Sequence, residues 1–445
     1  MSSFLLSDIK KNILVERLNV FLRYLVDHFD YYKRNLAELD LNINSLEDIS
    51  KFPLLDKKEE GAWQVADEAL AARPPAYFET SGTSGTPFPV LPDLGDERSK
   101  EFASFISEWL ALDDSPTITR AVIALPFEMN PIGLKYFLAL NHLGIISIPV
   151  GVRTHLCPPR QVLEIFERLK PELLIARPME ALRYAEAMAE QGKKPQESSI
   201  KKVILTGEII SESKFKRISH FFGGADVYSV YGLTELDSGG MVSCKKYQYH
   251  LPSKPYLLVE LLDDDFKKQK IKDGDTGNIV LTNTNINFMP LLRYKTGDRG
   301  ELKIKCNCGQ FDTPVINLLG RSKDSISHDG QDIFPIHLEN IILKYNCISS
   351  DYQVVKHGDK LSLRLEWCGD YNQTQVSIFI KQLQNELLNS LNINIEVVIF
   401  EPSTLVNRLG IAKSKAGTLH IFEKNIEKIN SSEILNMNYG CTHDL

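Results

Sequence analysis

The segment with the clearest chemical potential is small and rich in hydroxyl groups. Residues 80–87 read Thr-Ser-Gly-Thr-Ser-Gly-Thr-Pro. Glycine lets a backbone turn tightly, and successive N–H groups with neighbouring hydroxyls can surround phosphate oxygens. The segment lacks the lysine of a P-loop, and a flexible surface loop has the same composition. The candidate phosphate contacts are Ser81, Gly82, Thr83, Ser84, Gly85 and Thr86.

A second segment, residues 231–235, reads Tyr-Gly-Leu-Thr-Glu. The ring of Tyr231 can stack on a base, the hydroxyl of Thr234 can bind a phosphate, and the carboxylate of Glu235 can bind Mg²⁺ through oxygen. Gly232 lies between them. A turn beside a core tyrosine remains the alternative.

Two further segments carry charge that a nucleotide could use. Residues 293–298 end in Asp298, and an acidic side chain on a tight turn can accept both hydroxyls of a ribose, as in dinucleotide-binding folds. Near the end of the chain, residues 410–417 contain Lys413 and Lys415. An ordinary turn aspartate and a solvated basic turn are the alternatives.

A separate set of residues predicts a metal. Cys306 and Cys308 follow the Asp298 segment, and Cys244 and His250 follow the Tyr231 segment. Three thiolates and one imidazole make a tetrahedral zinc set that leaves no open position, so the zinc would be structural. Reduced cysteines without a metal remain the alternative.

Composition excludes several classes of protein. The chain has 445 residues and a net charge of −7, which favours two or three domains and argues against a nucleic-acid surface. No apolar run is long enough to cross a bilayer, and no charged stretch precedes an apolar segment at the N-terminus. We therefore expect a cytoplasmic protein with reduced thiols and no membrane partner.

The elements that must position these residues follow from periodicity. Residues 8–40 are predicted to form an amphipathic helix, whose apolar face is Ile13, Leu14, Leu18, Leu22, Leu25 and Phe29. A helix over 135–142 is expected among strands, and this alternation predicts a largely parallel α/β sheet. The expected strands are 121–125, 145–150, 173–176 and 202–206.

The second half of the chain has a different pattern. Residues 256–318 predict a compact β subdomain with strands at 257–262 and 278–282. Past Gly320 we expect a smaller α+β unit, so the domains divide as 1–322 and 323–445. Its expected elements are helices near 335–345 and 373–390 and strands near 361–367 and 395–400. From about residue 426 the tail is polar and is expected to be poorly ordered.

The order and separation of these motifs resemble those of the adenylate-forming enzymes, the superfamily of acyl-CoA synthetases, luciferases and peptide-synthetase adenylation domains. The resemblance covers residues from about 50 to 420. Within it the chain looks most similar to the phenylacetate–CoA ligase branch, because it is short, Phe334-Pro335 precedes Leu338-Glu339, and Phe88 follows Pro87 where other members have lysine. The resemblance implies a large α/β N-terminal adenylation domain and a small, mobile C-terminal lid.

The resemblance also implies an activity. ATP would activate a carboxylic acid, of an aromatic class, to an acyl-adenylate with Mg²⁺, and the thiol of coenzyme A would then displace AMP. Residues 81–86 would hold the β- and γ-phosphates, Tyr231 would stack on adenine, Thr234 would bind the α-phosphate and Glu235 would ligate Mg²⁺. The remaining nucleotide contacts would be Gly207 and Glu208 at the adenine cleft, and Asp298 and Arg321 at the ribose.

Other roles carried over by the resemblance concern motion and the acid. Lys413 matches the catalytic lysine, with Lys415 as the competing candidate, and Lys323 matches the interdomain hinge. The helix at 135–142 matches the part of the fold that lines the acyl pocket, so Tyr136 and Phe137 are pocket candidates. Some phenylacetate–CoA ligase-like proteins also carry a metal site comparable to the cysteine and histidine set.

The sequence departs from the family pattern in two places. Ala412 precedes Lys413 where the family has glycine. Asp329 precedes Gly330, on the face that would accept the thiol, and its charge would repel the phosphates of coenzyme A. A phosphopantetheinyl acyl carrier protein therefore stays open as the alternative acceptor. A homologue that binds nucleotide without turnover is a further alternative, which the retained Glu235, Asp298 and Arg321 argue against.

Overall fold

A computed structural model describes most of the chain up to Glu401. The described residues are 7–80, 86–110, 118–152, 157–236, 240–252, 256–267, 269–270, 272–328, 331–357, 360–368 and 372–401. The chain divides into two compact units. The first comprises residues up to Val152, Leu156–Ile209 and Ser219–Ser322, and the second includes Ile210–Ile218 and the residues from Lys323 onward.

The first unit begins with short helices rather than with one long one. Helix α1 spans Asp8–His28 and α2 spans Asp30–Asn35, because Phe29 adopts an extended backbone (φ −128°, ψ 116°). The single helix predicted over 8–40 is therefore wrong. Ile13, placed on the apolar face, is 40% exposed, because the buried stripe runs one residue later along the helix, through Leu14, Leu18, Phe21, Leu22 and Leu25.

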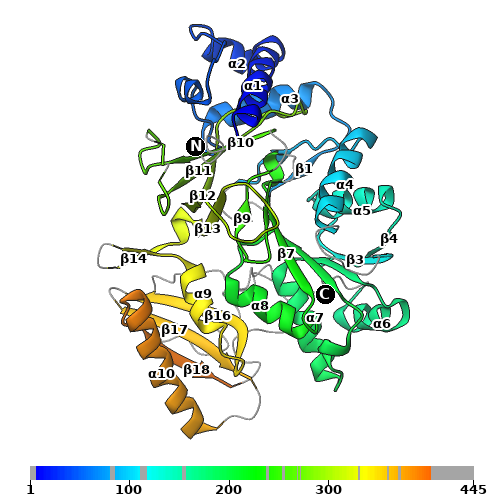
Figure 1. The fold of residues 1–445 in the computed structure, drawn as a ribbon, viewed down its shortest axis with the longest axis vertical. Helices are drawn as coiled ribbons and strands as arrows, with labels where there is room; N and C mark the ends of the chain where they lie inside the picture. The colour runs from blue at the N-terminus through cyan, green and yellow to red at the C-terminus, as the bar shows by residue number, and fades with distance from the viewer. Residues whose placement is uncertain are drawn as a thin grey trace, which may run out of the picture. The chain divides into compact units, whose positions relative to one another are not determined.

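The chain then forms η2 (Leu46–Lys51), α3 (Glu60–Ala71) and a two-stranded hairpin of β1 (Phe78–Glu79) and β2 (Pro89–Val90). Figure 1 shows α1, α2 and α3 grouped at the same end of this unit as β10. None of the described helices combines the length and apolarity that a membrane-spanning helix needs.

The centre of the first unit is a sheet of eleven strands in the order β10-β11-β12-β13-β9-β8-β7-β6-β5-β3-β4 (Figure 1). Strands β4, β3, β5, β6 and β7 pair in parallel. The apolar runs of β3, β5, β6 and β7 are buried, as expected for strands that helices cover on both faces, whereas β4 at the edge of the sheet is more exposed. Their bounds are β3 Arg120–Ala124, β4 Ile146–Pro149, β5 Leu173–Ala176, β6 Lys202–Thr206 and β7 Asp226–Tyr231.

Helices make the crossovers of this parallel part, which confirms the predicted α/β pattern. They are α5 Ile132–His142, α6 Pro159–Leu169, α7 Pro178–Glu190 and α8 Glu212–Phe221, and α4 Asp96–Leu110 precedes the first of these strands. A short turn, η3 (Pro195–Glu197), precedes β6. Aromatic side chains of α4 and α5 pack into one core, with Phe102 edge-on to Tyr136 at 5.1 Å between ring centroids.

The remaining strands of the sheet are antiparallel. They are β8 Met241–Ser243, β9 Tyr249–His250, β10 Leu257–Leu262, β11 Thr276–Asn283, β12 Tyr294–Lys303 and β13 Val315–Arg321. Strand β13 pairs with β9, β9 with β8, and β8 with β7. The β subdomain is thus hydrogen-bonded into the same sheet as the parallel strands, which brings motifs far apart in sequence onto neighbouring strands.

The second unit is a small α+β structure, as the pattern predicts. After η5 (Ser322–Asp324), β14 (Ile326–His328) and β15 (Gln331–Ile333) form a hairpin. A three-stranded sheet carries α9 and α10 around a core of its own. The bounds are α9 Pro335–Ile342, β16 Ile348–His357, β17 Lys360–Trp367, α10 Gln373–Leu391 and β18 Glu396–Phe400.

Candidate nucleotide site and metal centre

The hydroxyl-rich segment connects the two strands of the β1–β2 hairpin. The N–H of Thr80 donates to the carbonyl of Phe88 at 2.9 Å, and the N–H of Phe88 donates to Oγ1 of Thr80 at 2.9 Å. These bonds join the two ends of the segment. Ser81–Gly85 lie outside the described residues, and Thr86 is exposed.

Three predicted nucleotide residues meet in one network. The hydroxyl of Tyr231, at the end of β7, donates to Oδ2 of Asp298 at 2.9 Å. Nε of Arg321 lies 2.9 Å from Oδ1 of the same carboxylate, because Asp298 and Arg321 are paired across β12 and β13. Tyr231 and Arg321 are 90 positions apart in the chain, and the antiparallel strands bring them to one carboxylate.

The Asp298 carboxylate is buried and held in place by its neighbours. It is 3% exposed, and Oγ1 of Thr296 accepts from its backbone N–H at 3.0 Å. Burial, and then the charge of Asp298, raise the pKa of Tyr231 well above its ordinary value, so the tyrosine stays a neutral donor. Carboxylate oxygens are hydrogen-bond acceptors, which is the chemistry that binding of ribose hydroxyls requires.

Glu235 forms a second polar network close by in the fold. It lies on η4 (Thr234–Leu236) and is 7% exposed. Its Oε1 accepts from the hydroxyl of Tyr294 at 3.1 Å and from Nζ of Lys57 at 3.3 Å. Oε2 has no partner among the described residues. Hard cations such as Mg²⁺ prefer carboxylate oxygens, so this free oxygen fits the predicted ligand role.

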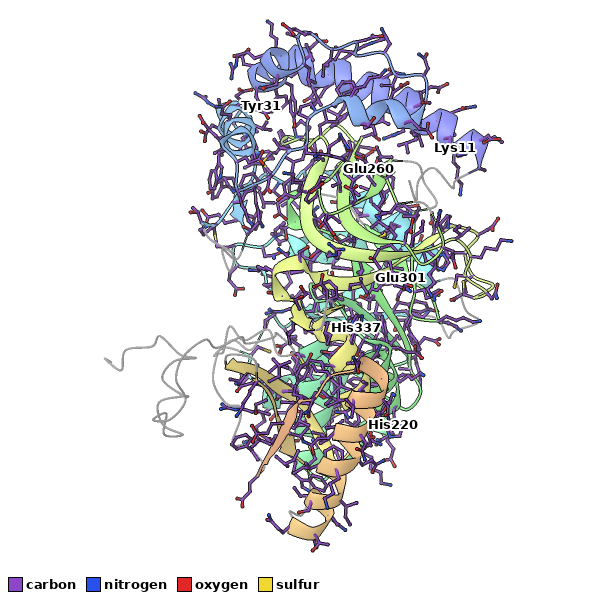
Figure 2. The ribbon with its side chains drawn as sticks, turned by 90° about the vertical axis from the view of Figure 1, so that its left-hand side faces the viewer. Lys11, Tyr31, His220, Glu260, Glu301 and His337 are labelled. Carbon is purple, nitrogen blue, oxygen red and sulfur yellow. The ribbon has the colours of Figure 1, made fainter. Side chains whose placement is uncertain are left out.

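The segment that precedes Lys57, residues 52–55, is held in place by Arg293. The Arg293 guanidinium makes a two-point ion pair with buried Glu260 (3.0 and 2.8 Å) and donates to the carbonyl of Phe52 at 2.6 Å. The N–H of Leu55 donates to the carbonyl of Arg293 at 3.1 Å. Figure 2 labels Glu260 on its strand among the side chains of this unit. Removal of one partner from an ion pair this deeply buried would leave an uncompensated charge. Arg293 and Glu260 together therefore fix residues 52–55 and, through them, the position of Lys57.

The other predicted residues of the first unit lie as follows. Gly207 follows β6 with φ +86°, a left-handed conformation that favours glycine, and Glu208 comes next. Tyr136 is fully buried and its hydroxyl has no hydrogen-bond partner among the described residues, whereas Phe137 is partly buried. Lys323 is exposed on η5.

The four predicted metal ligands also come together. The ligand atoms of Cys244, His250, Cys306 and Cys308 all lie within 4.8 Å of one another. Sγ of Cys244 is 3.7 Å from Sγ of Cys306, and Sγ of Cys308 is 3.5 Å from Nε2 of His250. Zinc–sulfur bonds of about 2.3 Å in a tetrahedron give sulfur separations of about 3.8 Å, so the cluster has the dimensions of a zinc site.

The surroundings of the cluster prepare its ligands. Nδ1 of His250 lies 3.0 Å from the carbonyl of Thr313, an arrangement that puts the proton on Nδ1 and directs Nε2 to the cysteines. Burial lowers the pKa of His250, which favours the neutral, ligating imidazole. Backbone N–H groups of Lys246 and Gln310 donate to Sγ of Cys244 and Cys308 at 3.3 and 3.4 Å, as suits thiolate ligands.

Known proteins resemble the chain over most of its length. Residues 330–416 match the model of the AMP-binding enzyme C-terminal domain. The phenylacetate-coenzyme A ligase of Thermus thermophilus is 26% identical over 390 residues, which cover 84% of this chain and 83% of that protein. That of Aromatoleum evansii is 23% identical over 421 residues, covering 90% and 92%. These relatives support the resemblance of the chain to the adenylate-forming superfamily, in its phenylacetate–CoA ligase-like branch.

Solved structures agree on the fold. A 2-hydroxyisobutyryl-CoA ligase in the postadenylation state, in complex with 2-HIB-AMP, superposes with a TM-score of 0.78 at 17% identity, over 93% of this chain and 89% of that one. The phenylacetate-coenzyme A ligase relatives and this acyl-CoA ligase fold together support an AMP-forming acid–thiol ligase. Lys413, Lys415 and Gly330 fall in the segment that matches the C-terminal family model. These three residues and Asp329 lie outside the described residues.

The structure of this adenylate-forming enzyme adds residues that the motifs do not reveal. Lys57 and Tyr294 contact Glu235, and Glu260 anchors the arginine of the Asp298 segment. Tyr294 stands inside that segment, so its position offered a signal. Lys57 and Glu260 offered none, since a lysine in a charged run and an acid in a buried strand become informative only when their partners are known.

Proposed function

We propose that this protein uses ATP to convert a carboxylic acid of an aromatic class to its acyl-adenylate and then transfers the acyl group to the thiol of coenzyme A. The convergence of Tyr231 and Arg321 on Asp298 carries the proposal. These residues come from three separate motifs, and together they offer a flat ring, a cation and a carboxylate, which match the base and ribose of a nucleotide.

In the first half-reaction a carboxylate oxygen of the acid attacks the α-phosphorus of ATP. The bond to the β-phosphate oxygen breaks, pyrophosphate leaves, and the acid becomes a mixed anhydride with AMP. Charge accumulates around the α-phosphate, so positioned donors and cations provide most of the stabilisation. The hydroxyl of Thr234 and the ammonium of Lys413 are proposed for the α-phosphate. Backbone and hydroxyl donors of residues 81–86 are proposed for the β- and γ-phosphates.

Glu235 is proposed as the Mg²⁺ ligand through Oε2. Mg²⁺ would neutralise phosphate charge when it is bound. Lys57 is a second source of positive charge here, 3.3 Å from Oε1 of Glu235. Because the loop at residues 80–87 contains no lysine, Lys57 provides at this position a cation that the loop itself lacks.

In the second half-reaction the thiol attacks the acyl carbonyl, the bond to the phosphate oxygen breaks, and AMP leaves with the electron pair. We assign Lys323 to the hinge at which the lid rotates between the two half-reactions. It begins the C-terminal segment of the second compact unit. Rotation at one exposed residue needs little unpacking, which supports this choice.

The aromatic class of the acid rests on the side chains between α4 and α5. Aromatic rings favour edge-to-face and offset contacts with other rings. Tyr136 belongs to the hydrophobic core here, and the partly buried rings packed against that core are Phe102, Phe105, Phe127 and Phe137. We assign Tyr136 and Phe137 to the acid pocket. Within this proposal a linear aliphatic acid is expected to react more slowly.

The cysteine and histidine cluster is proposed to bind a structural zinc. Four protein ligands leave no open position for substrate. The bound metal would hold the loop after β12 against β9, and those two strands also belong to the sheet that carries Asp298 and Arg321. Its effect on the reaction is therefore through stability.

The test is acid-dependent exchange of labelled pyrophosphate into ATP over a panel of aryl, arylacetic and aliphatic acids, followed by mass spectrometry of thioester products. We expect exchange with an aromatic acid and a thioester with coenzyme A. Thioester formation only with a holo-acyl carrier protein would replace the proposed acceptor. Absence of exchange with every acid, in folded protein with Mg²⁺, would refute the proposed function.

A further inference from the structure

Arg177 stands where a ligand of the parallel sheet is expected to bind. It follows β5 directly and is the residue before α7. In open α/β sheets, ligands bind beyond the carboxyl ends of the strands. Residue Ala176, at the end of β5, is paired with Leu205 of β6, so Arg177 emerges beside the residues that follow β6.

The stem of Arg177 reaches across to the predicted adenine loop. A Cβ placed on Gly207 would lie 3.6 Å from Cγ and 3.7 Å from Cδ of Arg177. The side chain therefore covers Gly207 rather than pointing to bulk solvent, and the residue is only partly exposed. The guanidinium is thus carried by a stem that lies against the edge of the proposed nucleotide cleft.

Arg177 differs from other arginines in a comparable environment. Four described arginines have a buried Nε without a hydrogen-bond partner: Arg177, Arg183, Arg217 and Arg299. The other three have partners elsewhere on the guanidinium or side chain: Arg217 donates to the carbonyls of Ile348 and Tyr345, Arg299 pairs with Asp264, and Arg183 has interactions of its own. Within the described part of the chain, the Arg177 side chain makes no hydrogen bond or ion pair.

A partly buried guanidinium without an acceptor is costly. Its planar donors match the two oxygens of a carboxylate or phosphate, so the missing partner has the chemistry of an oxyanion. The acidic residue of the next turn, Glu180, is itself buried and has interactions of its own. It makes no ion pair with Arg177.

The triphosphate of ATP is not the natural partner. Its proposed ligands, Thr234 and Glu235, follow β7, which is two strands away from β5 in the sheet. Neighbouring strands are about 4.8 Å apart, so the two positions are separated by about 10 Å, with Gly207 between them. The oxyanion at Arg177 belongs to a different group from the one that reacts at Thr234.

We propose that Arg177 is a specificity residue for a remote oxyanion on a second substrate, bound on the far side of Gly207 from the triphosphate. The proposal rests on the proposed function. Two substrates can supply this chemistry. The acceptor would supply it as the 3′-phosphate of coenzyme A, and the acid would supply it as a second carboxylate.

The experiment compares the wild type with Arg177→Gln, Arg177→Lys and a control, Arg160→Gln, whose side chain is 85% exposed on α6. One arm measures KM for coenzyme A and for 3′-dephospho-coenzyme A. The other measures pyrophosphate exchange with matched aromatic mono- and dicarboxylic acids. We expect the wild type to prefer the oxyanion-bearing member of one pair by about 10-fold to 100-fold, the scale of a charged hydrogen-bonded contact. Arg177→Gln should lose that preference and Arg177→Lys should keep part of it.

A preference lost only in the acceptor arm assigns the 3′-phosphate, and one lost only in the acid arm assigns the second carboxylate. Because the Arg177 side chain makes no hydrogen bond or ion pair with the described residues, Arg177→Gln should not lower the melting temperature. Equal behaviour of wild type and Arg177→Gln in both arms overturns the proposal, and so does a loss confined to the affinity for ATP. A wild type without any pyrophosphate exchange refutes the proposed function instead.

Discussion

The Asp298 network and the cysteine–histidine cluster draw on the same strands but are built in opposite ways. Asp298 lies in the first half of β12, and Cys306 and Cys308 come after its end. At about 3.3 Å per residue, the five residues from Asp298 to Lys303 put about 17 Å between the two regions. At Asp298 one carboxylate binds a hydroxyl and a guanidinium from two other motifs, whereas at the cluster four metal-ligand atoms lie within 4.8 Å of one another.

This difference separates a site for a substrate from a site for a permanent ligand. A substrate must enter and leave, so its site needs hydrogen-bonding groups that can exchange partners when the substrate binds. A structural metal is held by donors that exclude everything else, and its binding energy becomes folding energy. Variants in the two regions should therefore fail in different assays, and the four predictions below run from the largest expected effect on turnover to the smallest.

Lys413→Ala should give the largest loss on the substrate side. Loss of a cation at the adenylation centre is expected to slow acyl-adenylate formation by about 10²-fold to 10⁴-fold. Thiolysis of pre-formed adenylate should change much less, and the two half-reactions can be timed separately by quenched flow. Lys415→Ala is the matched control. If Lys415→Ala shows this pattern and Lys413→Ala does not, the assignment of the catalytic lysine is wrong.

Asp298→Asn tests the network itself. The amide keeps the shape but loses the charge that Arg321 pairs with and half of the acceptor capacity. We expect kcat/KM for ATP to fall by about 10-fold to 100-fold, measured by pyrophosphate exchange at varied ATP. Asp265→Asn, whose side chain is 78% exposed, should leave the kinetics unchanged. An unaltered kcat/KM in Asp298→Asn would remove Asp298 from the nucleotide site.

Lys57→Met should have a smaller effect of the same kind. The methionine keeps much of the stem and removes the charge beside Glu235. We expect KM for Mg-ATP to rise by about 10-fold, with little change in melting temperature. Lys58→Met, at the exposed neighbouring position, is the matched control. A fall in melting temperature without a change in KM would make Lys57 a structural partner of Glu235 only.

Cys308→Ser should lower stability more than it lowers activity, the opposite of the three variants above. We expect turnover per folded molecule to stay within about twofold while the melting temperature falls by about 5–10 °C, because one zinc ligand is lost. Calorimetry, elemental analysis and active-site titration together measure these quantities. Cys157→Ser, outside the cluster, should retain zinc and stability. Purified wild type without zinc, with all four side chains freely reactive, would rule the metal out.

The sequence by itself determined the types of chemistry and the class of fold. The spacing of Tyr231, Asp298 and Arg321 predicted a nucleotide site, and their three motifs do meet. The cysteines and His250 predicted a metal set, and their ligand atoms do cluster. The parallel strands 173–176 and 202–206 were predicted with the bounds that β5 and β6 have, because buried parallel strands are uniformly apolar and are hard to mistake.

Other features were decided only by the tertiary structure. The predicted helix over 8–40 stops at Phe29 because that side chain is buried against the core, a contact that helical periodicity does not encode. The contact of Lys57 with Glu235 spans 178 positions and depends on residues 52–55, which Arg293 holds in place. Arg177 is unremarkable in sequence and becomes notable only because no acceptor among the described residues reaches it. Long-range pairing sets each of these, and local residue patterns carry no information about a partner that the fold has yet to bring near.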